Sequence, residues 1–409
     1  MSEREWREAS DMKPSTLALL LVVAVGFTLR VWHVGTGMPL AVVAGEPAVM
    51  SAVVQMLKSG DFNPHVFECP TGYVYLQLGV ALIGFLSGAV RHAWSAVEQV
   101  GAADFYVWGR ICSAAIGTAT ILLLHQVGMR WGARHALLAA GLFAVMPLHV
   151  LASHVVVPDA PLVFAVTLTL LLSLRAIEKP ATLAFVLAGA AAGLSAGLEY
   201  NGFSALVMPI GAALMAGAGR GRGVTDSLAV LTGCVGAFFI TTPYALLDLP
   251  HFLNGFGAAA QALAVGQPDP MPSWLAYLQQ LVATFQWPAF IMAISGMVLS
   301  VVRMFRGPMH YRWVLLVLFP AVFFQLIAGW PLRSDGYVLP MVPFMCLCAA
   351  IATISGVSLL RRFDIPRVAR TTLIVGLTVA ALLPPLVRSI RQVRAFGTTT
   401  TQAVSPAAR

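Results

Sequence analysis

The chain has 409 residues, of which 58% are hydrophobic and only 10% are charged. Soluble domains carry about a quarter charged residues, so this composition excludes an ordinary soluble enzyme. The net charge of +8 is spread over short segments between apolar runs, a pattern that indicates membrane topology and not a nucleic-acid partner. Apolar runs of about 20 residues recur along the whole length, as bilayer-spanning helices require. We therefore predict an all-α polytopic membrane protein.

About eleven of these runs are predicted to cross the bilayer as helices. They lie near residues 15–33, 106–128, 135–152, 160–177, 181–198, 202–219, 226–247, 286–302, 313–330, 337–358 and 371–387. Basic residues precede the first run, as they do in a signal peptide. That run is long, however, and the nearest small-residue cleavage position, around Ala44, is distant. We therefore predict an uncleaved first helix.

The run from Tyr73 to Val90 is also long enough to cross, and the distribution of basic residues decides where it lies. If it stays on one side and the N-terminus is cytoplasmic, most of the 25 Lys and Arg residues are cytoplasmic, as the positive-inside rule requires. If it crosses, every later loop changes side and the excess lies outside. We therefore predict an interfacial or re-entrant helix over 73–90 and an external C-terminus.

The prediction divides the chain into two parts. Residues 1–250 form a transmembrane module with an external loop, 36–105, that bears interfacial helices. Residues 251–409 add further transmembrane helices, an external amphipathic segment at 250–285 and a tail that we expect to be disordered from about residue 395. The five cysteines are scattered without a CxxC spacing, so neither a disulfide nor a metal site is expected.

The external stretch from Gly45 to Tyr75 is too polar to lie in lipid, because unpaired polar groups cost several kcal/mol to desolvate. Its ionisable residues are Glu46, Lys58, Asp61, His65 and Glu68. Glu46 is expected in the first turn of a helix, where the helix dipole favours a carboxylate. It either caps that helix or removes a proton from an acceptor hydroxyl. Glu68 is either a solvated loop acid or a second carboxylate of the same site.

The second external loop contributes His154 and Asp159. Asp159 follows Pro158 at the mouth of a helix, where Asp is a common capping residue. An ionisable residue at membrane depth is, however, a functional candidate by default. His154 has no neighbour at metal-ligand spacing, so we consider it, with His65, for substrate binding only.

Three arginines are candidates for binding a phosphate. Arg30 lies near the outer end of the first helix, Arg110 near the start of the second, and Arg333 in a late external loop. Each either extends its charged end to the interface or contributes to a cationic site, because the planar guanidinium suits phosphate oxygens.

Five short motifs follow one another along the chain. They are Gly45-Glu46-Pro47, then Gly60-Asp61-Phe62-Asn63-Pro64 with Pro70 and Tyr73-Val74-Tyr75-Leu76, then Ser153 with Pro158-Asp159-Ala160-Pro161-Leu162, then Gly193-Leu194-Ser195-Ala196-Gly197-Leu198-Glu199-Tyr200-Asn201-Gly202, and last Arg333 with Tyr337, Leu339-Pro340 and Pro343. In this order they resemble the GT-C membrane glycosyltransferases, and more specifically glycosyltransferase family 39, which includes protein O-mannosyltransferases and the bacterial aminoarabinose transferase. The resemblance runs from the first helix to about residue 350.

The resemblance implies transfer of a sugar from a polyprenyl-phosphate carrier, with inversion, on the outer face of the membrane. The protein must neutralise the growing charge of the leaving phosphate and align the acceptor hydroxyl. No metal or cofactor is implied, and the acceptor is a lipid, a glycan or a protein. The bacterial inner membrane, with the site on the periplasmic side, is the expected location. The residues expected at the carrier phosphate or substrate are Arg333, Arg110, Arg30, Tyr200, Tyr337, His65 and His154.

Three positions depart from the family's pattern. Gly45 replaces the catalytic Asp of the family's Asp-Glu pair, and Glu199 replaces a Lys expected at the carrier phosphate. Cys69 replaces a further Lys that follows the equivalent of Glu68 in the aminoarabinose enzyme. We therefore predict Glu46 as the base, with Glu68 and Asp159 as further site carboxylates.

Two alternatives to a working transferase remain open. The chain is then either a catalytically lapsed member that binds a lipid-linked sugar or a partner, or a transporter or flippase. Transporters usually show two related halves, and the sequence shows no such repeat. The lapsed member is therefore the stronger alternative.

Overall fold

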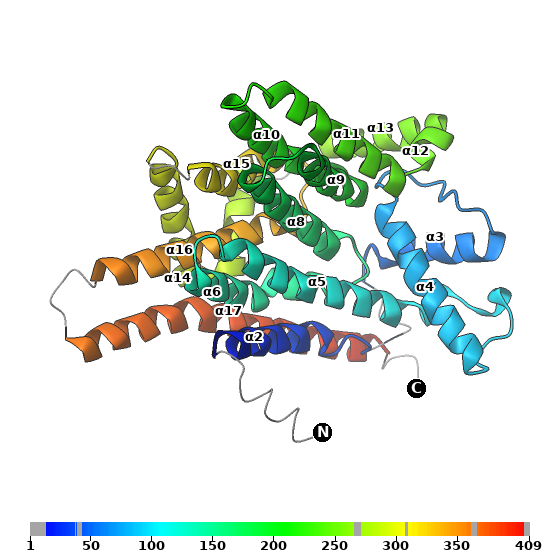
Figure 1. Cartoon of the computed structure of the whole chain (residues 1–409). Coiled ribbons are helices and arrows are strands. Elements are labelled where there is room, and N and C mark those ends of the chain that lie inside the picture. Colours follow the sequence, from blue (N-terminus) through cyan, green and yellow to red (C-terminus); the bar gives the residue numbers. More distant parts are fainter. Residues whose placement is uncertain are drawn as a thin grey trace, which may run out of the picture.

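The computed structural model describes residues 14–36, 38, 43–265, 271–306, 310–360 and 366–404, and within them every regular element is helical. Nine helices of this described part are long and apolar enough to cross a membrane, and three shorter apolar helices accompany them. The predicted all-α polytopic membrane fold is confirmed (Figure 1).

The elements follow one another with few residues between them. The α-helices are α2 (Pro14–Val31), α3 (Glu46–Ser59), α4 (Gly72–Val90), α5 (Tyr106–Gly128), α6 (Ala133–Ala144), α7 (Pro147–Ala152), α8 (Asp159–Glu178), α9 (Thr182–Leu198), α10 (Val207–Ala218), α11 (Gly223–Thr241), α12 (Tyr244–Leu247), α13 (Leu249–Val265), α14 (Ser273–Met304), α15 (His310–Ala328), α16 (Val342–Leu360) and α17 (Arg367–Val404). The 3-10 helices are η1 (Val97–Gln99), η2 (Ala102–Asp104), η3 (Tyr200–Leu206) and η4 (Asp335–Met341).

The helices of loop one lie at one end of the bundle. α3 and α4 project there beyond the end of α5 (Figure 1), and Gly72 at the start of α4 packs against the Gly197 carbonyl at the end of α9. α4 is itself one of the nine helices that could cross by length and composition. Its place at the end of the bundle supports the interfacial helix expected over 73–90.

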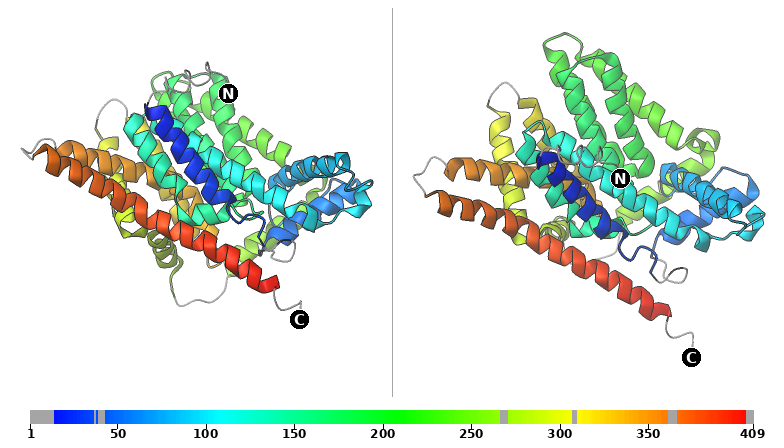
Figure 2. Two further views of the ribbon diagram at one scale, coloured as in Figure 1. Left: turned by 90° about the horizontal axis from the view of Figure 1, so that it is seen from below. Right: turned by 60° about the horizontal axis from the view of Figure 1, so that its bottom comes forward.

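α2 and α17 run in the same direction along the bundle, so the end of α17 lies at the loop-one end (Figure 2). Contacts support this arrangement: Ser389 Oγ donates to the Val145 carbonyl at 2.7 Å, and the ring of Phe396 lies 5.5 Å from that of His154. The C-terminal end of α17 and loop one therefore lie at the same end of the bundle.

The expectation of disorder from about residue 395 is wrong for the described part of the tail. α17 remains helical to Val404. Phe396 packs against His154, and the Arg394 guanidinium lies 5.7 Å from the centre of the Trp32 ring. These ring contacts hold the turns of α17 around Arg394 and Phe396 against the end of α2 and the segment after α7.

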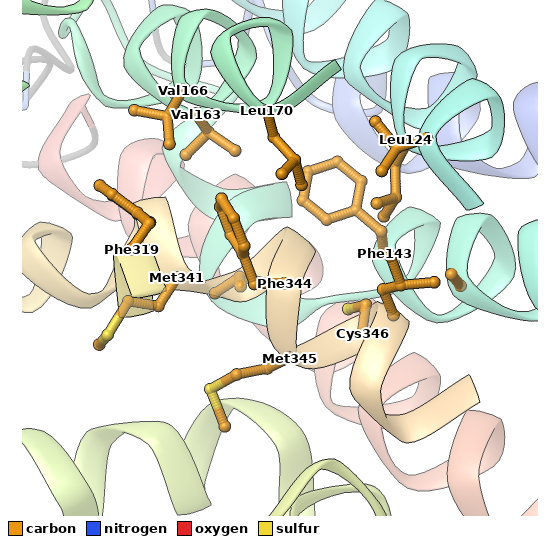
Figure 3. Close-up of a cluster of buried hydrophobic side chains, with 14 of the residues drawn as sticks. Leu124, Phe143, Val163, Val166, Leu170, Phe319, Met341, Phe344, Met345 and Cys346 are labelled. Carbon is orange, nitrogen blue, oxygen red and sulfur yellow. The ribbon is translucent and has the colours of Figure 1, made fainter. Parts of the chain in front are cut away.

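The core surrounds α16, whose spanning segment is 83% buried, more than any other candidate span of the described chain. Figure 3 shows Phe344 of α16 facing Phe319 of α15 and residues of α8, including Leu170. The Phe319 and Phe344 rings lie 5.0 Å apart. The same buried cluster includes residues of α5 and α6, so the parts before and after residue 250 share one core.

α9 packs against α11 through three glycines at four-residue spacing. A Cβ at Gly189, Gly193 or Gly197 would overlap, in turn, the Val230 carbonyl, the Cys234 carbonyl or the Thr241 hydroxyl. Small residues at this spacing let helix backbones approach closely in membranes. The close packing of α9 on α11 fixes the position of the start of η3, which follows α9.

Candidate functional site

Glu46 forms a buried ion pair with Arg110. Arg110 Nε donates to Glu46 Oε1 at 2.8 Å, Nη2 donates to Oε2 at 2.6 Å, and neither side chain is exposed. The backbone amides of Val43 and Val156 donate to the same carboxylate at 2.8 and 2.9 Å. All of its oxygens are therefore occupied. This environment favours an anchoring role for Glu46 over the role of base. Glu46 joins the start of α3 to α5 and to the second external loop.

Arg30 caps the end of α6 from within the core. Its Nη1 donates to the Gly26 and Ala144 carbonyls at 2.8 and 2.9 Å, and its Nη2 lies 3.3 Å from the Phe143 carbonyl and 3.1 Å from His149 Nδ1. A cation at a helix C-terminus is favoured by the dipole. Arg30 is fully buried, which favours this structural role over phosphate binding.

His154 is also fully buried. Its two ring nitrogens lie 2.8 and 2.9 Å from the carbonyl oxygens of Val150 and Trp32. The ring therefore joins the end of α2 to the segment after α7. These contacts favour a structural role over the substrate-binding role that the sequence analysis considers.

Asp159 and Glu199 are two half-buried carboxylates at the loop-one end, and the negative charge of the first acts on the second; we call them the carboxylate pair. Asp159 begins α8, and Gly336 of η4 packs so closely against it that a Cβ there would overlap Oδ1. Glu199 occupies extended backbone between α9 and η3, and its Oε2 accepts a hydrogen bond from Asn201 Nδ2 at 2.8 Å. Both carboxylates interact electrostatically with Tyr337.

The negative charge of Asp159 affects the ionisation of Glu199. Burial, and then the negative charge of Asp159, raise the pKa of Glu199 to about 8, whereas the hydrogen bond from Asn201 opposes this shift. In the part of the chain that the structure describes, no basic side chain forms an ion pair with either residue. A carboxylate with a raised pKa in such surroundings is a candidate for acid–base chemistry.

Arg333 connects the late loop to the start of α14. Its Nη2 donates to the Met271 carbonyl, and its Nε lies 3.2 Å from Ser273 Oγ. Ser273 Oγ in turn donates to the Trp330 carbonyl at 2.8 Å. The Trp330 ring lies 5.5 Å from that of Tyr337. Arg333 thus supports the loop that carries Tyr337 beside the carboxylate pair.

Glu68 is exposed and precedes α4. Its neighbour Phe67 is buried and accepts a hydrogen bond at its carbonyl from the Tyr200 hydroxyl at 2.8 Å. Phe252 of α13 packs edge-on against Phe67 at 5.9 Å. Tyr200 of η3 therefore holds this loop through its hydrogen bond to Phe67. The loop places Glu68 at the same end of the bundle as Glu199.

His65 lies apart from the carboxylate pair in an exposed polar network. Its Nε2 lies 3.0 Å from Asp61 Oδ2. Asn63 Nδ2 donates to Asp248 Oδ2 at 2.6 Å, and His251 Nδ1 lies 2.6 Å from Asp248 Oδ1. The network joins loop one to the segment before α13. This placement gives His65 a role in holding the loop.

Four of the predicted site residues, Glu46, Arg110, Arg30 and His154, are fully buried in contacts with other protein groups. Asp159, Tyr337 and Glu68 are at least partly exposed at the loop-one end. From the sequence, Glu199 is recognised only as the replacement of a Lys and not as a member of the site. Its position directly after a glycine-rich helix and before Tyr-Asn is the sequence signal that could have identified it.

Comparison with known proteins identifies the fold. Residues 104–246 match the family model described as dolichyl-phosphate-mannose-protein mannosyltransferase. The structure of the oligosaccharyltransferase AglB from Archaeoglobus fulgidus superposes with a TM-score of 0.65 at 14% identity, covering 94% of this chain and 56% of that one. ArnT from Cupriavidus metallidurans superposes with a TM-score of 0.61 at 18% identity, covering 96% of this chain and 77% of that one. The chain has the GT-C fold.

The resemblance to GT-C glycosyltransferases that the motifs predict is confirmed. Two of the solved relatives contain a lipid phosphate: an AglB complex with an inhibitory peptide and a dolichol-phosphate, and ArnT bound to undecaprenyl phosphate. This GT-C chain spans little more than half the length of AglB. No curated protein matches it in sequence.

Proposed function

We propose that this GT-C protein transfers a sugar from a polyprenyl-phosphate carrier to an acceptor hydroxyl, with inversion, at the outer face of a bacterial inner membrane. The observation that supports this most strongly is the Asp159–Glu199 pair at the loop-one end of a GT-C fold. Among the residues that the structure describes, no basic side chain forms an ion pair with either carboxylate, which leaves them available as a base.

Asp159 is the base that the geometry favours. It is half-buried, whereas Glu46 has both oxygens occupied by Arg110 and by backbone amides. In the reaction, the acceptor O–H bond breaks and its proton passes to Asp159. The acceptor oxygen bonds to the anomeric carbon while the bond from that carbon to the carrier phosphate oxygen breaks, and the phosphate keeps the electron pair.

Transfer from radiolabelled polyprenyl-phosphate sugars in membranes tests this proposal. Asp159→Gln and Asp159→Asn should lower turnover by about 10²–10⁴-fold, the usual contribution of a general base. Glu98→Gln, which changes an exposed acid of loop one, is the matched control and should retain native turnover. Full activity of both Asp159 variants would assign the base elsewhere, with Glu68 as the next candidate.

A catalytically lapsed protein that binds a lipid-linked sugar is the second candidate. The observation that favours it is that Arg30, Arg110 and Arg333 all bond to protein groups. Binding of undecaprenyl phosphate without transfer from any donor would support this candidate.

A further inference from the structure

We propose that the end of the bundle opposite loop one binds the phosphate of an anionic glycerophospholipid through Arg130, Arg175 and Arg312. Arg130 and Arg312 share one carboxylate, Glu178, and Arg175 joins Arg130 at Gln126. This inference goes beyond the proposed function and does not depend on it, because neither member of the carboxylate pair takes part.

The three arginines lie at the ends of helices that lead away from loop one. α5 begins at Tyr106, directly after loop one, and Arg130 lies just beyond its other end. α8 begins with Asp159 at the loop-one end and carries Arg175 in its last turn, where Glu178 ends the helix. Both helices are long and apolar enough to cross a membrane. The arginines therefore lie where the lipid headgroups of the second membrane surface are expected.

The charge of this arginine cluster is unbalanced. Arg130 Nε and Nη2 donate to the two Glu178 oxygens at 2.9 and 3.1 Å, and Arg312 Nη2 lies 3.7 Å from Oε1 of the same carboxylate. Within the described ranges of the chain, no other carboxylate forms an ion pair with any of the three arginines. Three guanidinium groups thus share one carboxylate, which leaves positive charge for an anion from outside the chain.

Contacts to protein groups hold two of the guanidinium groups in place. Arg312 Nη1 donates to the Arg130 carbonyl at 2.7 Å, and its guanidinium lies 5.7 Å from the centre of the Tyr311 ring. Arg130 Nη1 donates to the Gln126 carbonyl at 3.2 Å. Because a planar guanidinium that is already oriented loses little freedom on binding, this arrangement suits phosphate oxygens.

Arg175 supplies the donors that the other two arginines use within the protein. Its side chain is exposed, and the one hydrogen bond that it makes among the described residues is long, 3.4 Å from Nη2 to Gln126 Oε1. Arginine carries several N–H donors in a fixed fork. Most of those of Arg175 are therefore available to a phosphate beside Arg130.

The neighbouring surface of α5 favours a lipid over a free phosphate. Leu122 and Met129 are 42% and 48% exposed. They are seven positions apart, so they lie on one face of the helix, with Gln126 between them. An acyl chain packs along this face while its phosphate stays at Gln126 and Arg175. Basic groups between transmembrane helices bind anionic headgroups in this way.

Native mass spectrometry of the full chain in detergent, stripped of lipid, tests the proposal. Dioleoyl phosphatidylglycerol and dioleoyl phosphatidylethanolamine have the same acyl chains and a phosphate each, but only the first carries a net negative charge. The native protein should therefore bind phosphatidylglycerol more tightly. Arg175→Gln should weaken this binding about fivefold, the effect of one basic residue at a membrane surface.

Arg222→Gln is the matched control. Arg222 is also exposed and lies at the same end of the bundle, where its Nη2 donates to Thr182 Oγ1 at 3.2 Å. This variant should keep the native affinity for phosphatidylglycerol. Equal affinity of the native protein for the two lipids, or equal losses in Arg175→Gln and Arg222→Gln, would overturn the proposal.

Soluble glycerophosphoglycerol, the same headgroup without acyl chains, distinguishes a lipid from a free phosphate. It should not displace phosphatidylglycerol at equal concentration, and displacement would refute the lipid as the ligand. Phosphatidylglycerol should also raise the unfolding temperature of the native protein more than that of Arg175→Gln, because a ligand stabilises the folded state that binds it. Equal shifts would contradict the role of Arg175. None of these measurements involves sugar transfer, so their failure leaves the proposed function intact.

Discussion

Arg110 holds Glu46 through both carboxylate oxygens, at 2.8 and 2.6 Å, inside a region where neither side chain reaches solvent. The pair lies where α3, α5 and the second external loop meet, since the Val156 amide also donates to Glu46. Loop one is therefore fixed to the bundle at its first helix. We expect its acidic motif to position the loop.

The Glu46–Arg110 pair predicts a loss of stability on single substitution. Glu46→Gln should lower the free energy of unfolding by about 3–5 kcal/mol, because Arg110 is left as an uncompensated buried charge. Arg110→Met should lower the free energy of unfolding by a similar amount, because the Glu46 carboxylate is then left as the uncompensated buried charge. Thermal unfolding in detergent measures both.

The double variant of Glu46→Gln and Arg110→Met provides the control. It should be less destabilised than the sum of the two single variants, because no unpaired charge remains. Strictly additive losses would show that the two side chains do not depend on each other.

Gly336 predicts a catalytic effect without a large stability effect. Gly336→Ala places a methyl group against Asp159 Oδ1, so the carboxylate must move from its position. A misplacement of this size can cost about 10²-fold in turnover. Gly329→Ala is the matched control, because only ordinary contacts at 3.5 and 3.8 Å surround its Cβ position. Equal turnover of the two variants would contradict the placement of Asp159 in the site.

The α9–α11 contact predicts strong sensitivity to side-chain size. Gly193→Val should destabilise the protein by at least about 1–3 kcal/mol, because the added atoms meet the Cys234 carbonyl, which is backbone and cannot rotate away. Gly236→Val on the exposed side of α11 meets nothing within 4 Å and serves as the control. The two variants are compared by thermal unfolding and by their yield from membranes.

The loop network predicts an acid-dependent release of loop one. Hydrogen bonds from the Asn63 amide and His65 lower the pKa of Asp61, and those from His251 and Asn63 lower the pKa of Asp248. The bonds are therefore complete above the ordinary Asp pKa of about 3.9 and are lost as pH falls below it. Hydrogen exchange at residues 60–66 should be slow at pH 6 and relatively faster, after correction for intrinsic rates, at pH 3.

Asn63→Ala tests whether the network is the cause. It removes the link to Asp248 and should give fast exchange at both pH values. Protection at pH 6 that survives this substitution would assign the stability of the loop to other contacts.

Cys69 allows the side of the membrane to be tested. It is exposed, whereas Cys112 is half-buried and Cys234, Cys346 and Cys348 are buried. A membrane-impermeant maleimide added to intact spheroplasts should label Cys69, and Cys69→Ser should abolish the signal. A Cys at position 98, made by Glu98→Cys in that background, should restore labelling. Labelling of both positions only after lysis would place loop one in the cytoplasm.

The sequence alone determined the class of the molecule. Its apolar runs require a helical membrane protein, because lipid leaves backbone groups no partner except within a helix. The positions of Lys and Arg predict an interfacial or re-entrant helix over 73–90, and the structure has the helix α4 there, which by length and composition could also cross. The order of the short motifs identified the GT-C resemblance. All of these are properties of local composition and order, which a single chain displays directly.

Only the tertiary structure decided which charged residues are free to act. Glu46 and Arg110 are 64 positions apart, and Arg30 lies 114 positions from the carbonyl of Ala144. No local pattern predicts such partners, so the sequence assigned these buried contacts to catalysis and phosphate binding. Asp159 begins α8 and Glu199 follows α9 in extended backbone, and the close packing of α9 on α11 sets the position of Glu199 and η3. The ionisation of a carboxylate depends on its neighbours in space, and for this pair the fold supplies those neighbours.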